Sequence, residues 1–115
     1  MFAARAGARK VYAIDCSDIA IQAKVIVEQN GFSDVVEVIQ GKLEDLTLPV
    51  EYVDIIISEW MGYFLLYESM LDTVIYARDK YLRPGTGIMM PDKAVLYLCG
   101  IEDAEYKAEK VWCLS

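Results

Sequence analysis

Hydrophobic and polar positions alternate between two patterns along the chain. Short, continuous apolar runs rich in β-branched residues are typical of strands buried in a parallel sheet. Between these runs, apolar residues recur three and four positions apart, which predicts helices. Strands and helices that alternate with short connections indicate an α/β fold. The predicted strands are 10–15, 35–39, 53–57, 87–90 and 94–101, and the predicted helices are 18–30, 68–82 and 102–111.

Glycine and serine residues mark several predicted element ends. Gly7 follows the expected end of a first helix, because glycine readily takes the left-handed conformation of a helix cap. Ser17 is the predicted N-cap of the next helix, and Gly31 is its predicted end. Gly41 opens a turn after the second strand. A parallel, Rossmann-like sheet then places any ligand crevice at the carboxyl ends of these strands.

Length and composition limit the classes of function. The 115 residues are 56% hydrophobic and carry a net charge of −7, which fits a globular chain. The acidic balance repels nucleic acid and attracts cationic partners such as basic peptides. No apolar run is long enough to cross a membrane. Cys16, Cys99 and Cys113 are widely spaced and the chain has no histidine, so we expect no disulfide framework, no metal site and a location in the cytoplasm and nucleus.

Two acids at predicted strand ends are candidates for binding a nucleotide-like ligand. Asp15 closes the first strand, where a carboxylate can accept hydrogen bonds from both ribose hydroxyls. Glu44 lies in the turn after Gly41, where it could accept a hydrogen bond from an adenine amine while Leu43 covers the ring. The alternatives are that Asp15 or Ser17 only caps the next helix, and that Glu44 is an exposed turn carboxylate.

The segment 58–69 is the most informative part of the sequence. Glu59 and Glu68 bracket an interior that is almost entirely aromatic and aliphatic. If the loop folds back like a hairpin, two carboxylates face each other across an apolar pocket, which suits a planar guanidinium with five donors. Alternatively, Glu68 is an acid in the first turn of a helix and the aromatic residues are core. A glycosidase carboxylate pair is a further reading, but the Rossmann-like arrangement favours a nucleotide-like cofactor.

This loop resembles that of the protein arginine methyltransferases, especially the major eukaryotic group that forms asymmetric dimethylarginine. The double-glutamate motif of that family is matched by Ser58-Glu-Trp-Met-Gly-Tyr63 and Leu66-Tyr-Glu-Ser-Met-Leu71. The likeness covers nearly the whole chain and fades at 111–115. It continues through 53–57, 77–82, 90–92 and 100–103.

The resemblance implies a Rossmann-like, S-adenosylmethionine-dependent methyltransferase fold and methyl transfer from S-adenosyl-L-methionine to guanidinium nitrogens of protein arginine. Arginine-glycine-rich RNA-binding proteins and histones are the implied substrates, and the complete enzyme is expected to be a homodimer that contacts neither nucleic acid nor membrane. The implied roles are Glu59 and Glu68 as catalytic residues, Asp15 at the ribose, Gly41, Leu43, Glu44 and Met70 on the cofactor side, and Met61, Met70 and Tyr63 shaping the substrate space.

The chain also departs from the pattern of this family. Asp15 stands where the family usually has glutamate, so its ribose contact is expected to be weaker or water-mediated. We expect a fold truncated at the N-terminus, without the first strand and glycine-rich turn, and lacking the histidine segment and C-terminal β-barrel. Residues 1–92 are then a partial cofactor-binding domain and 93–115 the start of the barrel region. Weak cofactor binding follows, and a non-catalytic product that binds intact relatives is the alternative function.

Overall fold

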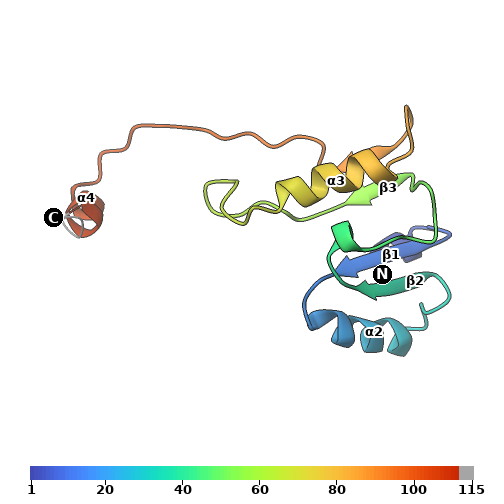
Figure 1. Ribbon diagram of the computed structural model, residues 1–115. Helices are drawn as coiled ribbons and strands as arrows, with labels where there is room; N and C mark the ends of the chain where they lie inside the picture. Colours follow the sequence, from blue (N-terminus) through green and yellow to red (C-terminus); the bar gives the residue numbers. More distant parts are fainter. Residues whose placement is uncertain (112–115) are drawn as a thin grey trace.

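The chain forms alternating strands and helices along most of its length, as Figure 1 shows for the computed structural model. The structure describes residues 1–111, so Cys113 and most of the divergent segment 111–115 lie outside it. Seven of the eight predicted strands and helices are found within a few residues of their expected ends. The elements are α1 (Phe2–Arg5), β1 (Val11–Asp15), α2 (Ile19–Gln29), β2 (Val36–Gln40), the 3-10 turn η1 (Leu43–Asp45), β3 (Ile55–Ile57), α3 (Leu71–Tyr81), β4 (Ile88–Met90) and α4 (Ala104–Val111).

The strands form two parallel ladders instead of the single sheet that the sequence predicted. In one ladder β1 pairs with β2, from Val11 opposite Val36 to Asp15 opposite Gln40. In the other, β3 pairs with β4, from Ile55 opposite Ile88 onward. Within residues 1–111 no strand lies between β1 and β3, so backbone hydrogen bonds do not join the ladders. The strands β1, β2 and β3 nevertheless point the same way (Figure 1), which places their carboxyl ends on one side.

Two small clusters of buried side chains hold these ladders to their helices. Helix α2 packs against β2 and β1, where Ala20, Val27 and Val36 are buried. The second cluster lies under α3. It contains Leu48, Trp60, Val74, Ala77 and Tyr81.

Glycines end two helices as the sequence predicted, whereas the predicted serine cap is wrong. Gly7 follows α1 with φ of +98°, and Gly31 follows α2 with φ of +70°; both values favour a residue without Cβ. The N-cap of α2 is Asp18, and its side chain makes no capping hydrogen bond. Ser17 does not cap because its hydroxyl donates to Asp15 instead.

The predicted strand at 94–101 does not form. These residues run away from the two ladders as an extended connection to α4 (Figure 1). Their apolar side chains are exposed, with Tyr97 86% and Leu98 84% accessible. A β-prone sequence becomes a strand only against a partner edge, and the described residues supply none here. Helix α4 forms as expected, with the Tyr106 amide donating to Asp103 at 2.8 Å.

Within residues 1–111, none of the helices combines the length and the apolar character that a membrane crossing requires.

Candidate functional site

Asp15 ends β1 and is held by the turn that follows it. The backbone amide and the hydroxyl of Ser17 donate to Asp15 Oδ1 at 2.8 and 2.6 Å. These two hydrogen bonds stabilise the ionised carboxylate and lower the pKa of Asp15 below its usual range. The carboxylate is exposed, and Oδ2 accepts no hydrogen bond from any described residue. Asp15 is therefore an ionised acceptor with one oxygen open to a ligand.

Gln40, which the sequence analysis did not single out, locks the end of β2 to the same turn. Its side-chain amide donates to the Ser17 carbonyl and to Asp18 Oδ1, both at 3.2 Å. The next amide, of Gly41, donates to the Asp15 carbonyl at 3.0 Å. The carboxyl ends of β1 and β2 thus form one connected edge. A polar residue closing an apolar strand was the only sequence signal for Gln40.

Gly41 leads directly from this edge into η1. Its φ is +152°, and a Cβ at this position would lie 3.1 Å from Leu46 Cδ2. The backbone conformation favours glycine, and the tight contact would be relieved only if the Leu46 side chain moved. Gly41 therefore lets the chain turn sharply from β2 into Leu43–Asp45.

Glu44 lies in η1 and reaches across to α3. Thr73 Oγ1 donates to Glu44 Oε1 at 2.5 Å. This hydrogen bond is the main reason that the pKa of Glu44 lies below its usual range. Leu43 beside it is half-buried. Glu44 is more than a free turn carboxylate, because Thr73 is its fixed partner; within residues 1–111 no other side chain donates to its Oε2.

The loop between β3 and α3 folds back as the hairpin that the sequence predicted. Gly62 and Leu65 form an antiparallel bridge, and the Gly62 amide donates to the Leu65 carbonyl at 3.1 Å. Phe64, Leu65 and Ser69 have φ values of 50°, 61° and 55°. Such left-handed conformations are uncommon for residues with a Cβ and often occur at ligand sites.

Glu68 returns to the beginning of this loop. A Cβ on Gly62 would lie 2.6 Å from Glu68 Cγ and 3.2 Å from Glu68 Oε1. The side chain of Glu68 therefore lies directly against Gly62. Gly62 is three residues after Glu59, which lies just beyond the end of β3. Because α3 begins only at Leu71 with Met70 as its N-cap, the interpretation of Glu68 as a first-turn helix acid is wrong.

The aromatic residues of the loop divide into one core residue and an exposed tip. Trp60 is 7% accessible, whereas Tyr63, Phe64 and Tyr67 are 76–87% accessible. The interpretation of these residues as core is correct only for Trp60. Glu59 and Glu68 are themselves exposed, so the described residues do not enclose them in the apolar pocket that the sequence suggested.

Met61, Met70 and Ser58 complete the description of this loop. Met61 and Met70 are partly exposed, at 37% and 42%. Ser58 follows β3, and its amide donates to the Met90 carbonyl at 2.9 Å. The Ser58 hydroxyl is buried and has no hydrogen-bond partner among residues 1–111. An orphaned polar atom beside Glu59 indicates that this strand end is built to meet another group.

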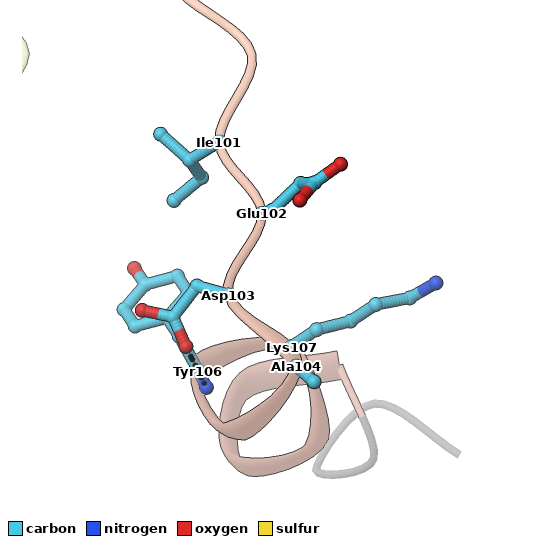
Figure 2. A pocket seen from close by; sticks show the side chains of 6 residues that line it. All are labelled: Ile101, Glu102, Asp103, Ala104, Tyr106 and Lys107. Carbon is cyan, nitrogen blue, oxygen red and sulfur yellow. Dashed lines mark hydrogen bonds between the residues drawn. The ribbon is translucent and has the colours of Figure 1, made fainter.

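Two hollows on the surface of residues 1–111 lie away from these carboxylates. One, of about 140 Å³, is lined by Trp60, α3 and residues 89–94. The other lies beside the start of α4 and is lined by residues 101–104, Tyr106 and Lys107; Figure 2 shows Ile101 and Tyr106 on one side of the backbone and Glu102 and Lys107 on the other. Neither has a candidate acid in its lining.

The acids at the strand ends fit the hydroxyl and amine donors of an adenosine-containing cofactor. Asp15 and Glu44 are ionised acceptors, each with one carboxylate oxygen open. Gly41 allows the close turn between them. Parallel strands with this pair of acceptors at their carboxyl ends are the arrangement expected of a site for a nucleotide-like cofactor.

Comparison with known proteins agrees with that class. Residues 1–90 match the family described as Methyltransferase domain. Protein arginine N-methyltransferase 1 of Chlamydomonas reinhardtii is 68% identical over 111 residues, and that of Schizosaccharomyces pombe is 61% identical; each alignment covers 96% of this chain and 32% of the relative. The chain belongs to the methyltransferase domain family, and over 96% of its length it is similar to protein arginine N-methyltransferases.

Solved structures place the same residues in the same fold. A Trypanosoma brucei PRMT1 enzyme-prozyme heterotetrameric complex with AdoHcy matches with a TM-score of 0.88 and 59% identity, over 96% of this chain and 34% of that one. Protein arginine methyltransferase 10 of Arabidopsis thaliana matches with a TM-score of 0.74 and 56% identity, over 77% of this chain and 25% of that one. The Rossmann-like fold class is confirmed, and the chain spans about a third of its curated relatives.

Proposed function

We propose that these residues carry the cofactor acids and the arginine-gripping loop of an enzyme that methylates protein arginine. The observation that carries this proposal is the folded-back loop, in which Glu68 lies against Gly62, three residues after Glu59. Two carboxylates presented by one short hairpin suit a guanidinium, whose planar fork can donate to both.

The proposed reaction assigns a distinct task to each pair of acids. S-adenosyl-L-methionine supplies a methyl group on a positively charged sulfur. Asp15 accepts hydrogen bonds from the ribose hydroxyls, and Glu44 accepts one from the adenine amine. Glu59 and Glu68 orient the guanidinium so that one terminal nitrogen approaches the methyl carbon in line. The new N–C bond forms as the C–S bond breaks, and the methylated guanidinium can then lose a proton to solvent. Positioning and electrostatics are the expected main sources of rate.

A methyl-transfer assay with an arginine-glycine-rich peptide tests this proposal. We expect Glu59→Gln and Glu68→Gln each to lower turnover about 100-fold or more, because loss of one charge misaligns the guanidinium. Cofactor affinity should stay unchanged. Glu51→Gln is the matched control, since Glu51 is an exposed acid outside the site. The assay is run on this chain and on a chain of the relatives' full length that contains it. Near-normal turnover in both variants would refute the assignment of Glu59 and Glu68 to the substrate guanidinium.

The finer features of the function follow from this proposal. Arginine-glycine-rich RNA-binding proteins and histones are the proposed substrates, which the acidic net charge of −7 supports. Assembly with further subunits is proposed because the Trypanosoma brucei neighbour is a heterotetramer. The division at residues 92 and 93 and the location in cytoplasm and nucleus also remain proposals.

A second candidate is a non-catalytic role in which this chain binds intact relatives. It is favoured by the separate ladders, because the edges of β1 and β3 that face away from their partners are open to another strand. The prozyme in the Trypanosoma brucei complex is a precedent for such assembly. This second role would be favoured if the chain co-purifies with a full-length relative while neither this chain nor the full-length chain that contains it transfers a methyl group.

A further inference from the structure

Four polar residues of α3 form hydrogen bonds with the segment 44–48, which begins in the turn η1. Thr73, Tyr76 and Lys80 lie three and four positions apart, so they share a face of the helix, and Tyr81 directly follows Lys80. All four hydrogen-bond to the segment 44–48, which lies at least 29 residues away in sequence. A face with this many contacts to one short turn is a specific attachment.

The shortest of these hydrogen bonds is the one to the Glu44 carboxylate. Thr73 Oγ1 donates to Glu44 Oε1 at 2.5 Å, and Tyr76 Oη donates to the Glu44 carbonyl at 3.4 Å. The same residue is thus held at its side chain and at its backbone. Since η1 is a single 3-10 turn without a capping side chain, its own hydrogen bonds cannot fix this orientation.

Lys80 and Tyr81 secure the end of the same turn. The Lys80 ammonium donates to Tyr76 Oη at 2.8 Å and to the Leu46 carbonyl at 3.4 Å. It also lies 5.1 Å from the Tyr76 ring centre and 5.0 Å from that of Tyr81, where a cation is attracted by the ring face. Tyr81 Oη donates to the Leu46 carbonyl at 3.2 Å.

We propose that Thr73, Tyr76 and Lys80 are positioning residues that preset the Leu43–Asp45 turn and the Glu44 carboxylate for the adenine amine before the cofactor arrives. This inference rests on the proposed function of Glu44. Thr73 occupies Oε1 and leaves Oε2 for the amine. Tyr76 and Lys80 hold the backbone from which that carboxylate projects. Because α3 also begins directly after the glutamate loop, one helix positions both halves of the site.

The first test uses the 115-residue chain without cofactor. Carboxyl carbon NMR follows the titration of Glu44 in the parent chain and in Thr73→Val, which removes the hydroxyl at nearly constant shape. We expect the pKa of Glu44 to rise toward its usual range in Thr73→Val and to stay low in Thr73→Ser. Asp15, held by Ser17, reports that the fold is intact, and Thr86→Val is the control for an exposed threonine elsewhere. An unchanged Glu44 titration in Thr73→Val would overturn the proposal.

A second variant decides the outcome if Thr73→Val unfolds the chain. Tyr76→Phe keeps the ring that contacts Lys80 and removes only the hydroxyl. We expect the amides of Asp45 and Leu46, which donate within the turn at 3.0 and 3.2 Å, to exchange with solvent about tenfold faster. The Leu82 amide at the end of α3 should not change. Equal exchange at Asp45 and Leu46 in both chains would refute the proposal.

Titration with S-adenosylhomocysteine then separates this inference from the proposed function. We expect Thr73→Val to weaken binding about tenfold and Thr73→Ser to restore it. If Glu44→Gln weakens binding but Thr73→Val does not, the positioning role is wrong and the cofactor site stands. If neither variant changes the binding, Glu44 is not a cofactor residue, and the proposed function fails at that point.

Discussion

Gly62→Ala should inactivate the arginine site without unfolding the chain. The added methyl group would lie 2.6 Å from Glu68 Cγ, whereas ordinary contacts begin at 3.4 Å. The φ angle of Gly62 lies outside the left-handed range, so alanine can adopt the backbone conformation. The conflict is therefore confined to the Glu68 side chain, which is exposed and free to move.

The size of the effect follows from how far that side chain must move. Glu68 Cγ has to retreat by about 1 Å, and a misplacement of this size in a substrate-positioning group can cost about 100-fold in rate. The free energy of unfolding should change by no more than about 0.5 kcal/mol, as is usual for surface substitutions. Turnover should therefore fall steeply while the free energy of unfolding stays nearly constant.

Methyl transfer to an arginine-glycine-rich peptide measures the loss, in a chain of the relatives' full length that contains these residues. Urea unfolding and S-adenosylhomocysteine binding are measured in parallel and should not change. Gly100→Ala is the matched control, since a Cβ there meets no atom within 4 Å. Full turnover by Gly62→Ala would refute the close packing of Glu68 on Gly62 as a requirement of the site.

Two further changes test the parts that hold the strand ends. Tyr81→Phe should lower the free energy of unfolding by about 1–3 kcal/mol, because the buried Leu48 amide loses its acceptor and the Leu46 carbonyl loses a donor; urea unfolding measures this. Ser17→Ala should raise the pKa of Asp15 toward its usual range, since the hydroxyl is the main cause of the lowered pKa. A depressed carboxyl pKa stabilises the fold above the unfolded pKa, and this contribution is lost as pH falls from the unfolded to the folded pKa. In Ser17→Ala the contribution should therefore be smaller, and its loss should be complete at a higher pH.

Each of these changes has a control in the same chain. Tyr52→Phe removes the hydroxyl of a tyrosine that is 38% exposed and should leave stability unchanged, so an equal loss in both variants would argue against the Tyr81 contacts. For Ser17→Ala, Glu44 should titrate as before, because Thr73 holds it independently. An unchanged Asp15 titration would show that the Ser17 hydroxyl does not hold the carboxylate.

The apolar runs were sufficient to place β1 to β4, because continuous β-branched runs have few alternatives to a buried strand. The apolar runs could not show which strands pair with each other. The four strands share one sheet only if a further strand lies between β1 and β3, and no local sequence pattern encodes such a neighbour. The same reason explains the wrong strand at 94–101, whose composition is β-prone but whose backbone has no partner among the described residues.

The site shows the same division between local and distant information. The composition of segment 58–69 was sufficient to single out Glu59 and Glu68, because both acids belong to one short segment, whereas the fold-back that the structure shows was only a condition of that interpretation. Thr73 and Gln40 were missed, since their partners lie 29 and 22 residues away. Ser17 was assigned to the wrong partner because a serine before a helix can cap it or donate to a preceding acid, and the two choices look alike in sequence.

The central claim is that Glu59 and Glu68 recognise a guanidinium. The most direct measurement compares methyl transfer to an arginine-glycine-rich peptide and to the same peptide with lysine in place of arginine, using the chain in its full-length context. We expect methylation of the arginine peptide alone, because the guanidinium offers five donors in a fixed planar fork whereas the lysine ammonium is a compact point charge. This methylation should be lost in Glu59→Gln and Glu68→Gln but not in Glu51→Gln. Equal methylation of the lysine peptide, or normal turnover in both glutamine variants, would contradict the claim.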